Sequence, residues 1–163
     1  MLRLSAALLL AASCLAHASP QSATPWPGTV TRVSDGDTLW VRPAAGGAPQ
    51  KIRVHGIDAP ELCQAYGPQA RSALRRWTLH RALQVEPLHV DDYGRLVARL
   101  WLDGQDLAAR MVHDGHAWSY RYRHSPGPYA EEERAARAAR RGLFADAGAQ
   151  RPYAFRRAHG PCG

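Results

Sequence analysis

Lysine is almost absent from this sequence. Lys51 is the only one, although lysine and arginine together number 21 against 14 aspartate and glutamate residues, which gives a formal net charge of +7. The positive charge is therefore carried almost entirely by arginine, whose planar guanidinium suits bidentate contacts to phosphate. This composition indicates binding to nucleic acid or another polyanion. An arginine-biased codon usage, which the many alanines also suggest, explains the same composition, so charge alone does not decide the function.

Long apolar runs are also absent beyond the N-terminus. No later segment approaches the ~20 apolar residues that a transmembrane helix needs, so we expect no stable membrane span. The N-terminus has a basic region ending at Arg3, an apolar run over residues 4–15 and a small-x-small pattern at residues 16–18. These features predict a signal peptide over residues 1–18, cleaved after Ala18, and a secreted or periplasmic mature chain. Lipidation at Cys14 is the alternative, although alanine stands three residues before it where leucine is usual.

Cysteines are few, and the histidines lack the spacing of metal ligands. Removal of a signal peptide leaves Cys63 and Cys162, which we expect to form a disulfide in an oxidising compartment. The bridge would close a loop of nearly the whole domain, for which the chain-entropy model gives roughly 4 to 5 kcal/mol. None of the eight histidines belongs to a His-x-x-x-His pair, so we assign no histidine a catalytic role.

The pattern of apolar residues predicts one domain that is mainly β. Residues 19–27 are rich in proline, serine and threonine and indicate a flexible leader, residues 28–145 form the domain, and residues 146–163 form a C-terminal tail. Strands are expected at 29–33, 38–42, 51–57, 83–88 and 96–102, and helices at 68–78, 107–114 and 129–141. This order matches an α+β, mainly β fold, a five-stranded OB-fold Greek-key barrel with about three helices.

Three short segments carry the charges that phosphodiester chemistry needs. They are Asp35-Gly36-Asp37-Thr38, the run from Arg53 to Glu61, and Tyr93-Gly94-Arg95. Asp37 starts the second expected strand and Asp58 follows the third, so neighbouring strands could place both carboxylates at one rim of the barrel. Two carboxylates, a backbone carbonyl and waters suit a hard cation such as Ca²⁺. The lack of sulfur and imidazole ligands in these segments argues against zinc.

The other charges of these segments have separate predicted roles. Glu61 follows the stiff turn at Pro60 and could act as general base on a water beside the metal. Arg53 and Arg95 would stabilise the negative charge that builds on the phosphoryl oxygens during in-line attack. Asp35 is assigned to the turn or to outer support. Taken singly, the first and third segments are ordinary turns, whereas all three in this order favour catalysis.

Over residues 28–144, these segments and the closing Arg140-Arg141-Gly142-Leu143-Phe144 resemble the staphylococcal nuclease-type thermonucleases. The family fold is an OB-type barrel with three helices. The resemblance implies that calcium is bound by the carboxylates of Asp37 and Asp58 and by the backbone carbonyl of Ala59. It also implies action on the attacking water by Glu61, contacts to the scissile phosphate by Arg53 and Arg95, and hydrolysis of both DNA and RNA to 3′-phosphate ends.

The sequence departs from the family pattern at positions that concern the substrate. Ala59 replaces a threonine, which a carbonyl ligand should tolerate, and Asp92 replaces a lysine before the turn tyrosine. Tyr93 aligns with that tyrosine. Tyr120 or Tyr122 could stack on a base or meet a nucleotide phosphate, and stacking would be tolerant of base sequence. Ordinary packing of the segment explains these two tyrosines equally well.

The residues and the resemblance together predict a secreted, calcium-dependent nuclease of low sequence specificity that acts as a monomer on DNA and RNA. The alternative is a non-catalytic OB-fold module that binds nucleic acid through its basic surface. Such a module would be expected to have lost some of the charged residues that catalysis needs. All five of them are present here, namely Asp37, Arg53, Asp58, Glu61 and Arg95. Replacement of calcium by magnesium is left open.

Overall fold

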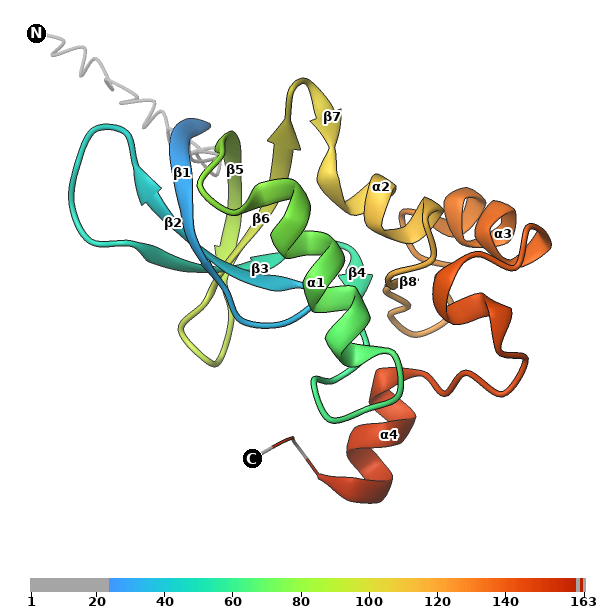
Figure 1. The fold of residues 1–163 in the computed structure, drawn as a ribbon. Coiled ribbons are helices and arrows are strands. Elements are labelled where there is room, and N and C mark those ends of the chain that lie inside the picture. The colour runs from blue at the N-terminus through green and yellow to red at the C-terminus, as the bar shows by residue number, and fades with distance from the viewer. Residues whose placement is uncertain (1–23, 161, 163) are drawn as a thin grey trace, which may run out of the picture.

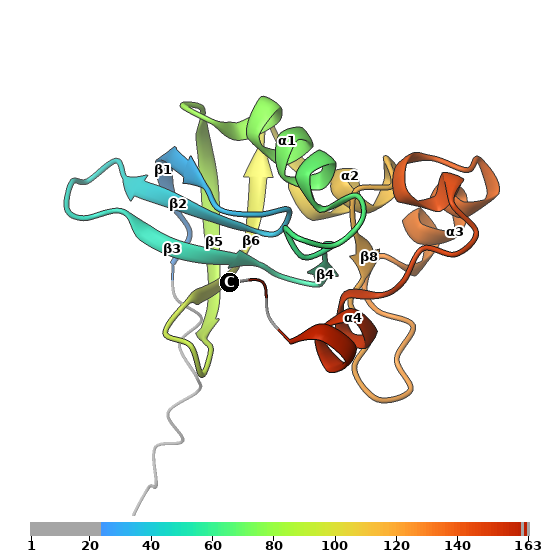
Figure 2. The ribbon, with the colours of Figure 1, turned by 60° about the horizontal axis from the view of Figure 1, so that its bottom comes forward.

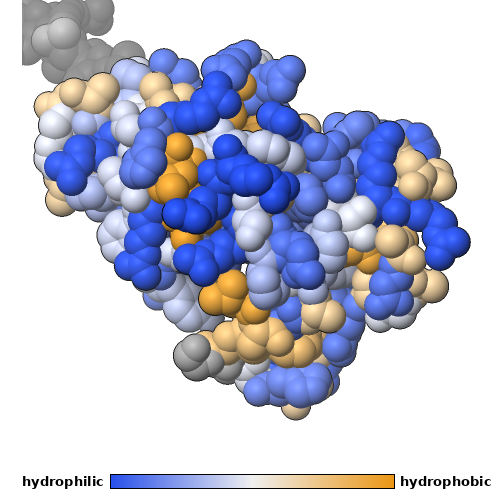
Figure 3. Space-filling view, in the orientation of Figure 1, coloured by the Kyte–Doolittle hydropathy of each residue, from blue (hydrophilic) through white to orange (hydrophobic). Residues whose placement is uncertain are grey.

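The structure, a computed structural model, describes residues 24–160 and 162. The predicted signal peptide, its alternative at Cys14 and the first residues of the expected leader lie outside this part of the chain. Among the described residues, no helix is both long enough and apolar enough to cross a membrane. The face shown in Figure 3 is covered largely by hydrophilic residues, with small apolar patches between them.

Five strands close into a small barrel, seen on the left of Figure 1. They are β1 (Trp26–Val33), β2 (Thr38–Pro43), β3 (Gln50–Val54), β5 (Ala82–Val90) and β6 (Leu96–Leu102). Antiparallel neighbours follow the order β3-β2-β1-β5-β6, and a parallel pairing of β3 with β6 joins the two edges. The closed barrel confirms the predicted OB-type fold. Strand β1 begins inside the expected leader and includes its last two residues, Trp26 and Pro27.

Alternating apolar side chains fill the barrel. Val30 and Leu39 are fully buried on β1 and β2, and further buried residues of the same core are Val41, Ile52, Val54, Val85, Ala98 and Leu100. Two helices, α1 (Gly67–Thr78) and α2 (Leu107–His113), add Leu74 and Met111 to this core. Burial of each such side chain contributes about 1.5–3 kcal/mol. The strand ends that carry the charged segments are therefore fixed on a rigid scaffold.

The expected third strand is interrupted after Val54. The chain turns at Gly56 and resumes as the short strand β4 (Ile57–Asp58), which pairs with β8 (Trp118–Ser119) in a second, two-stranded sheet. Gly56 has a φ of 78°, and a Cβ atom there would lie 2.6 Å from Cγ of Pro128. Only glycine tolerates both conditions. The break therefore places Asp58 outside the barrel sheet.

Helices α1 and α2 agree with the predicted helices, and Asp106 caps α2. Its Oδ1 accepts the amide hydrogens of Ala108 and Ala109 at 2.8 and 3.2 Å. Strand β7 (Gln105–Asp106) pairs with β6 just before this cap. Helix α3 (Ala130–Ala138) is shorter than the expected 129–141 and is followed by the 3₁₀ helix η1 (Gly142–Ala145).

Glu133 ties the outer helices together. The residue is 2% exposed, and its Oε2 accepts the amide hydrogen of Ser119 at 3.0 Å. Its Oε1 lies 2.8 Å from Arg151, 2.9 Å from Arg137 and 3.5 Å from Arg121. A buried carboxylate needs such partners. Glu133 thus joins α3 to β8 and to the segment that leads into the last helix.

The last helix, α4 (Pro152–His159), is missing from the sequence-based prediction, which assigned residues 146–163 to a tail. Proline in its first turn and basic residues in its last turn suit a helix. Figures 1 and 2 show α4 beside the loop that follows β4. A disulfide joins Cys63, in the loop after β4, to Cys162, which lies beyond α4.

Candidate active site

One guanidinium bridges two of the predicted metal ligands. Thr38 pairs with Arg53 in the antiparallel register of β2 and β3, which places Arg53 next to Asp37. Nη1 of Arg53 lies 2.9 Å from Oδ2 of Asp37, and its Nη2 lies 3.4 Å from Oδ1 of Asp58. The structure thus brings these three predicted site residues together at one rim of the barrel.

Two hydrogen bonds fix the carboxylate of Asp37. Its Oδ2 accepts the amide hydrogen of Ala59 at 3.0 Å, and its Oδ1 accepts the hydroxyl hydrogen of Thr38 at the same distance. The neighbouring Gly36 allows the two segments to approach, since a Cβ atom there would lie 2.6 Å from Cβ of Ala59. Asp37 is therefore held in one orientation by groups from both motif segments.

Crowding of the acids perturbs their titration. Burial and then repulsion by Asp37 raise the pKa of Asp58 to about 6, although Arg156 and Arg53 partly oppose the change. Burial and repulsion by Asp37 also raise the pKa of Asp35 to about 7. Asp35 supports the turn, because its Oδ1 accepts the amide hydrogen of Asp37 at 2.9 Å. A cation placed among these carboxylates would relieve their mutual repulsion.

The donor set of this rim fits a hard cation. Asp37 and Asp58 offer buried carboxylate oxygens. Among the described residues that line the cleft beside them there is no sulfur ligand, and the only imidazoles are those of His55 and His89. Within residues 24–160 and 162, no three histidine, cysteine, aspartate or glutamate side chains converge to hold an ion by themselves. Carbonyl oxygens and waters would have to complete the coordination, as is common for Ca²⁺.

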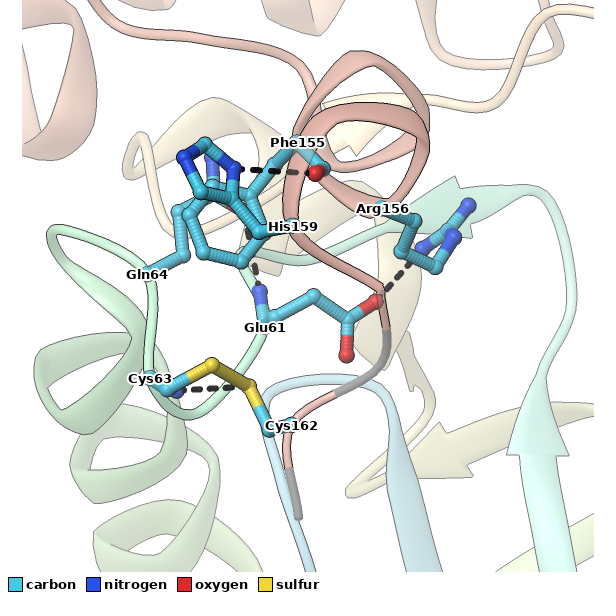
Figure 4. The surroundings of a disulfide bond; sticks show 7 residues. All are labelled: Glu61, Cys63, Gln64, Phe155, Arg156, His159 and Cys162. Carbon is cyan, nitrogen blue, oxygen red and sulfur yellow. Dashed lines mark hydrogen bonds and ion pairs between the residues drawn. A yellow bond between two sulfur atoms is a disulfide. The ribbon is translucent and has the colours of Figure 1, made fainter.

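Glu61 lies in the turn that follows β4 and contacts a residue that the sequence analysis missed. Its Oε1 is 2.6 Å from Nη1 of Arg156, which also lies 3.5 Å from Oδ1 of Asp58. Figure 4 shows this ion pair beside the disulfide. Arg156 belongs to α4, 95 residues away from Glu61. The expected pairing of Cys63 with Cys162 was the signal that could have brought this segment to the site.

Arg95 lines the same cleft, but it makes no ion pair or hydrogen bond with Asp37 or Asp58. Its Nη2 lies 2.7 Å from Oδ2 of Asp91, whose Oδ1 accepts the amide hydrogens of Tyr93 and Arg95 at 3.0 and 2.9 Å. Asp91 was not among the predicted site residues. The structure makes it the group that holds the guanidinium of Arg95 at the cleft wall.

Two of the three candidate substrate tyrosines line the cleft, and the third does not. Tyr93 and Tyr120 line the cleft, and Tyr93 is 85% exposed. The guanidinium carbon of Arg95 lies 5.4 Å from the centre of the Tyr93 ring. Tyr122 is exposed but is not among the residues that line the cleft; Arg123 lies 5.2 Å from its ring centre instead. The cleft has a volume of about 860 Å³. Two of the three tyrosines are therefore placed to meet a ligand there.

Carboxylates that suit a cation, set beside guanidiniums that suit a phosphate, are typical of a class of OB-fold proteins that act on phosphodiesters. Comparison with known proteins narrows that class. Residues 51–146 match the family described as "Staphylococcal nuclease homologue". The chain belongs to the staphylococcal nuclease family, as its motifs predicted.

Bacterial relatives match over most of their length. The chain is 38% identical to "Protein ParB" of Escherichia coli over 96% of this chain and 95% of the relative. It is 37% identical to "Micrococcal nuclease" of Shigella flexneri, over 80% of each chain. An "Uncharacterized endonuclease" of Haemophilus influenzae is 33% identical over 78% of this chain and 71% of its own length. The likeness thus extends beyond the matched domain.

Proposed function

We propose that the protein is a calcium-dependent nuclease that hydrolyses DNA and RNA with low sequence specificity and leaves 3′-phosphate ends. The observation that carries the proposal is the bridge from Arg53 to Asp37 and Asp58 at 2.9 and 3.4 Å, with Glu61 in the turn that follows Asp58. Membership of a nuclease family supports the reaction, and the names of two relatives describe nucleases.

Asp37, Asp58 and the backbone carbonyl of Ala59 would hold the metal ion in this proposal. The crowding that raises the pKa of Asp58 to about 6 supports a cation there. Bound calcium would supply positive charge to a phosphoryl oxygen. Asp37 and Asp58 do not transfer a proton in this scheme, because they must stay ionised to hold the ion.

The protein's own groups divide the remaining work. Glu61 would accept the proton of the attacking water, because its carboxylate lies beside the metal ligands and is only partly buried. Arg53 and Arg95 would donate hydrogen bonds to the phosphoryl oxygens as their negative charge increases. Tyr93 and Tyr120 would stack on or contact the nucleotide in the cleft, which gives contacts that tolerate any base sequence.

Export is part of the same proposal. The signal peptide expected at residues 1–18 would direct the chain out of the cytoplasm, where it would act as a monomer in the periplasm or outside the cell. The disulfide between Cys63 and Cys162 supports an oxidising destination, since such bonds are rare in reducing compartments.

Digestion of single-stranded DNA tests the proposal. We expect cleavage with calcium, no cleavage with EDTA, and a loss of at least 100-fold in Glu61→Gln. The control is Glu131→Gln, which removes an exposed carboxylate from α3 that pairs with Arg134. End-group analysis should find 3′-phosphates. Full cutting in EDTA, or full activity of Glu61→Gln, would refute the mechanism, and tight DNA binding without any cleavage would indicate the binding-module alternative.

A further inference from the structure

The last helix is fastened to the loop that carries the proposed general base. The loop side chain of Gln64 is buried; its Nε2 donates to the carbonyl oxygen of Gln150 at 2.6 Å, and its Oε1 accepts the amide hydrogen of Glu61 at 3.1 Å. The disulfide fastens the other end of the segment at Cys63. Figure 4 shows the contact of Gln64 with Glu61 and the neighbouring disulfide on one short stretch of loop. Both ends of α4 are therefore anchored to the turn after β4.

Between these anchors, Arg156 holds one oxygen of the Glu61 carboxylate. Nη1 of Arg156 lies 2.6 Å from Oε1 of Glu61. The other oxygen, Oε2, makes no hydrogen bond or ion pair with any residue in the described part of the chain. One oxygen is thus immobilised while the second is free to accept a hydrogen bond from a water in the cleft.

We propose that Arg156 is a positioning residue, which orients the carboxylate of Glu61 for its task, and that the Cys63–Cys162 disulfide keeps Arg156 in place. This inference rests on the proposed function, because it takes Glu61 as the general base. Gln64 fixes the backbone of Glu61, but the glutamate side chain has three rotatable bonds and needs its own partner. Misplacement of a reacting group by about 1 Å can lower a rate by about 100-fold.

The need for the disulfide follows from the short, exposed nature of α4. The helix has eight residues, and Pro152 is its only buried one. Isolated helices of this length are marginal in water, and packing normally stabilises them. With so little packing, α4 depends on its anchors. Opening the disulfide would let the helix leave the loop and take Arg156 with it.

Arginine substitutions in α4 test the inference. Arg156→Ala should lower kcat by about 10- to 100-fold with KM within about twofold of the wild type, and Arg156→Lys should recover part of the loss. The matched control is Arg157→Ala, which removes the same charge from the same helix at a position beside Tyr153. The double variant Cys63→Ser/Cys162→Ser should repeat the kcat loss of Arg156→Ala.

Two further measurements separate positioning from other roles. In the Glu61→Gln background, Arg156→Ala should cause no further loss, because a residue that acts through Glu61 has nothing left to orient. Binding of a fluorescent single-stranded oligonucleotide in EDTA should have the same dissociation constant and salt dependence in Arg156→Ala and Arg157→Ala. A smaller salt slope in Arg156→Ala alone would mean a direct phosphate contact and would overturn the inference.

The outcomes also distinguish this inference from the proposed function. If Glu61→Gln is inactive while Arg156→Ala cleaves as fast as Arg157→Ala, the positioning role is wrong and the proposed function stands. If Glu61→Gln cleaves at the wild-type rate, the proposed function fails first. An additive loss in the double variant Glu61→Gln/Arg156→Ala would show that Arg156 acts independently of Glu61, which also overturns the inference.

Discussion

Replacement of Asp58 by asparagine should stabilise the metal-free protein. The pKa of Asp58 rises from an ordinary 3.8 to about 6, mainly through burial and then through repulsion by Asp37. At about 1.4 kcal/mol for each tenfold change in an equilibrium constant, this difference makes the ionised form cost about 3 kcal/mol in the folded state. Asparagine resembles the neutral acid in shape. Both arginine partners keep another carboxylate, since Arg53 still pairs with Asp37 and Arg156 with Glu61.

The stabilisation should depend on pH with a defined sign. Below about pH 4, Asp58 is protonated in both the folded and the unfolded chain, so wild type and Asp58→Asn should be equally stable. Between about pH 4 and pH 6 the unfolded chain loses the proton while the folded chain keeps it, so the wild type loses stability as pH rises. Above about pH 6 the advantage of Asp58→Asn should stay constant at up to about 3 kcal/mol.

Urea unfolding in EDTA, followed by tryptophan fluorescence at pH 4 and pH 7.5, measures this difference. The control is Asp103→Asn, an exposed carboxylate paired with Arg81, which should change the free energy of unfolding by about 0.5 kcal/mol or less. Addition of calcium should stabilise the wild type but not Asp58→Asn. If Asp58→Asn were less stable than the wild type at pH 7.5 without metal, crowding of the acids would not dominate at this rim and the reasoning would be refuted.

Three further predictions concern other parts of the molecule. Arg53→Ala and Arg95→Ala should each lower the rate of oligonucleotide hydrolysis by about 10²- to 10³-fold with the circular dichroism spectrum retained, and near wild-type cleavage would remove that residue from the mechanism. Glu133→Ala should lower the free energy of urea unfolding by about 1–3 kcal/mol, because it leaves the buried amide of Ser119 without its acceptor and separates α3 from Arg151; a loss under about 0.5 kcal/mol would contradict its role as an anchor. Burial lowers the pKa of His116, so its neutral form stabilises the fold above about pH 6.5 and that contribution is lost as the pH falls. His116→Gln should therefore lose less stability than the wild type between pH 7.5 and pH 5, and equal losses in thermal unfolding would argue against this.

Most of the barrel could be predicted because its signals are local. Alternation of apolar residues marks the strands, and the fixed spacing from Arg53 to Glu61 carries several site residues on one segment. The interruption at Gly56 was visible as a glycine inside a strand, but its extent was not. The interruption involves Pro128, a residue distant in the chain that packs against Gly56.

The parts that sequence reasoning missed are set by contacts between distant residues. Helix α4 has little buried surface, so its apolar pattern is weak, and Arg156 meets Glu61 across 95 positions. The engagement of Arg95 by Asp91 needed the actual turn geometry of the hairpin. Tyr120 and Tyr122 are two residues apart and have similar chemistry, yet only Tyr120 lines the cleft. No local pattern distinguishes the two.

The disulfide also fixes the order in which the molecule can be completed. Cys63 and Cys162 are 99 residues apart, and strands β5 and β6 with helices α1 to α3 lie between them. The bond can close only after that whole stretch has been synthesised, and its closure needs oxidising conditions. The barrel strands end at Leu102, so in the proposed scheme the barrel can fold before the disulfide holds Arg156 beside the carboxylate of Glu61.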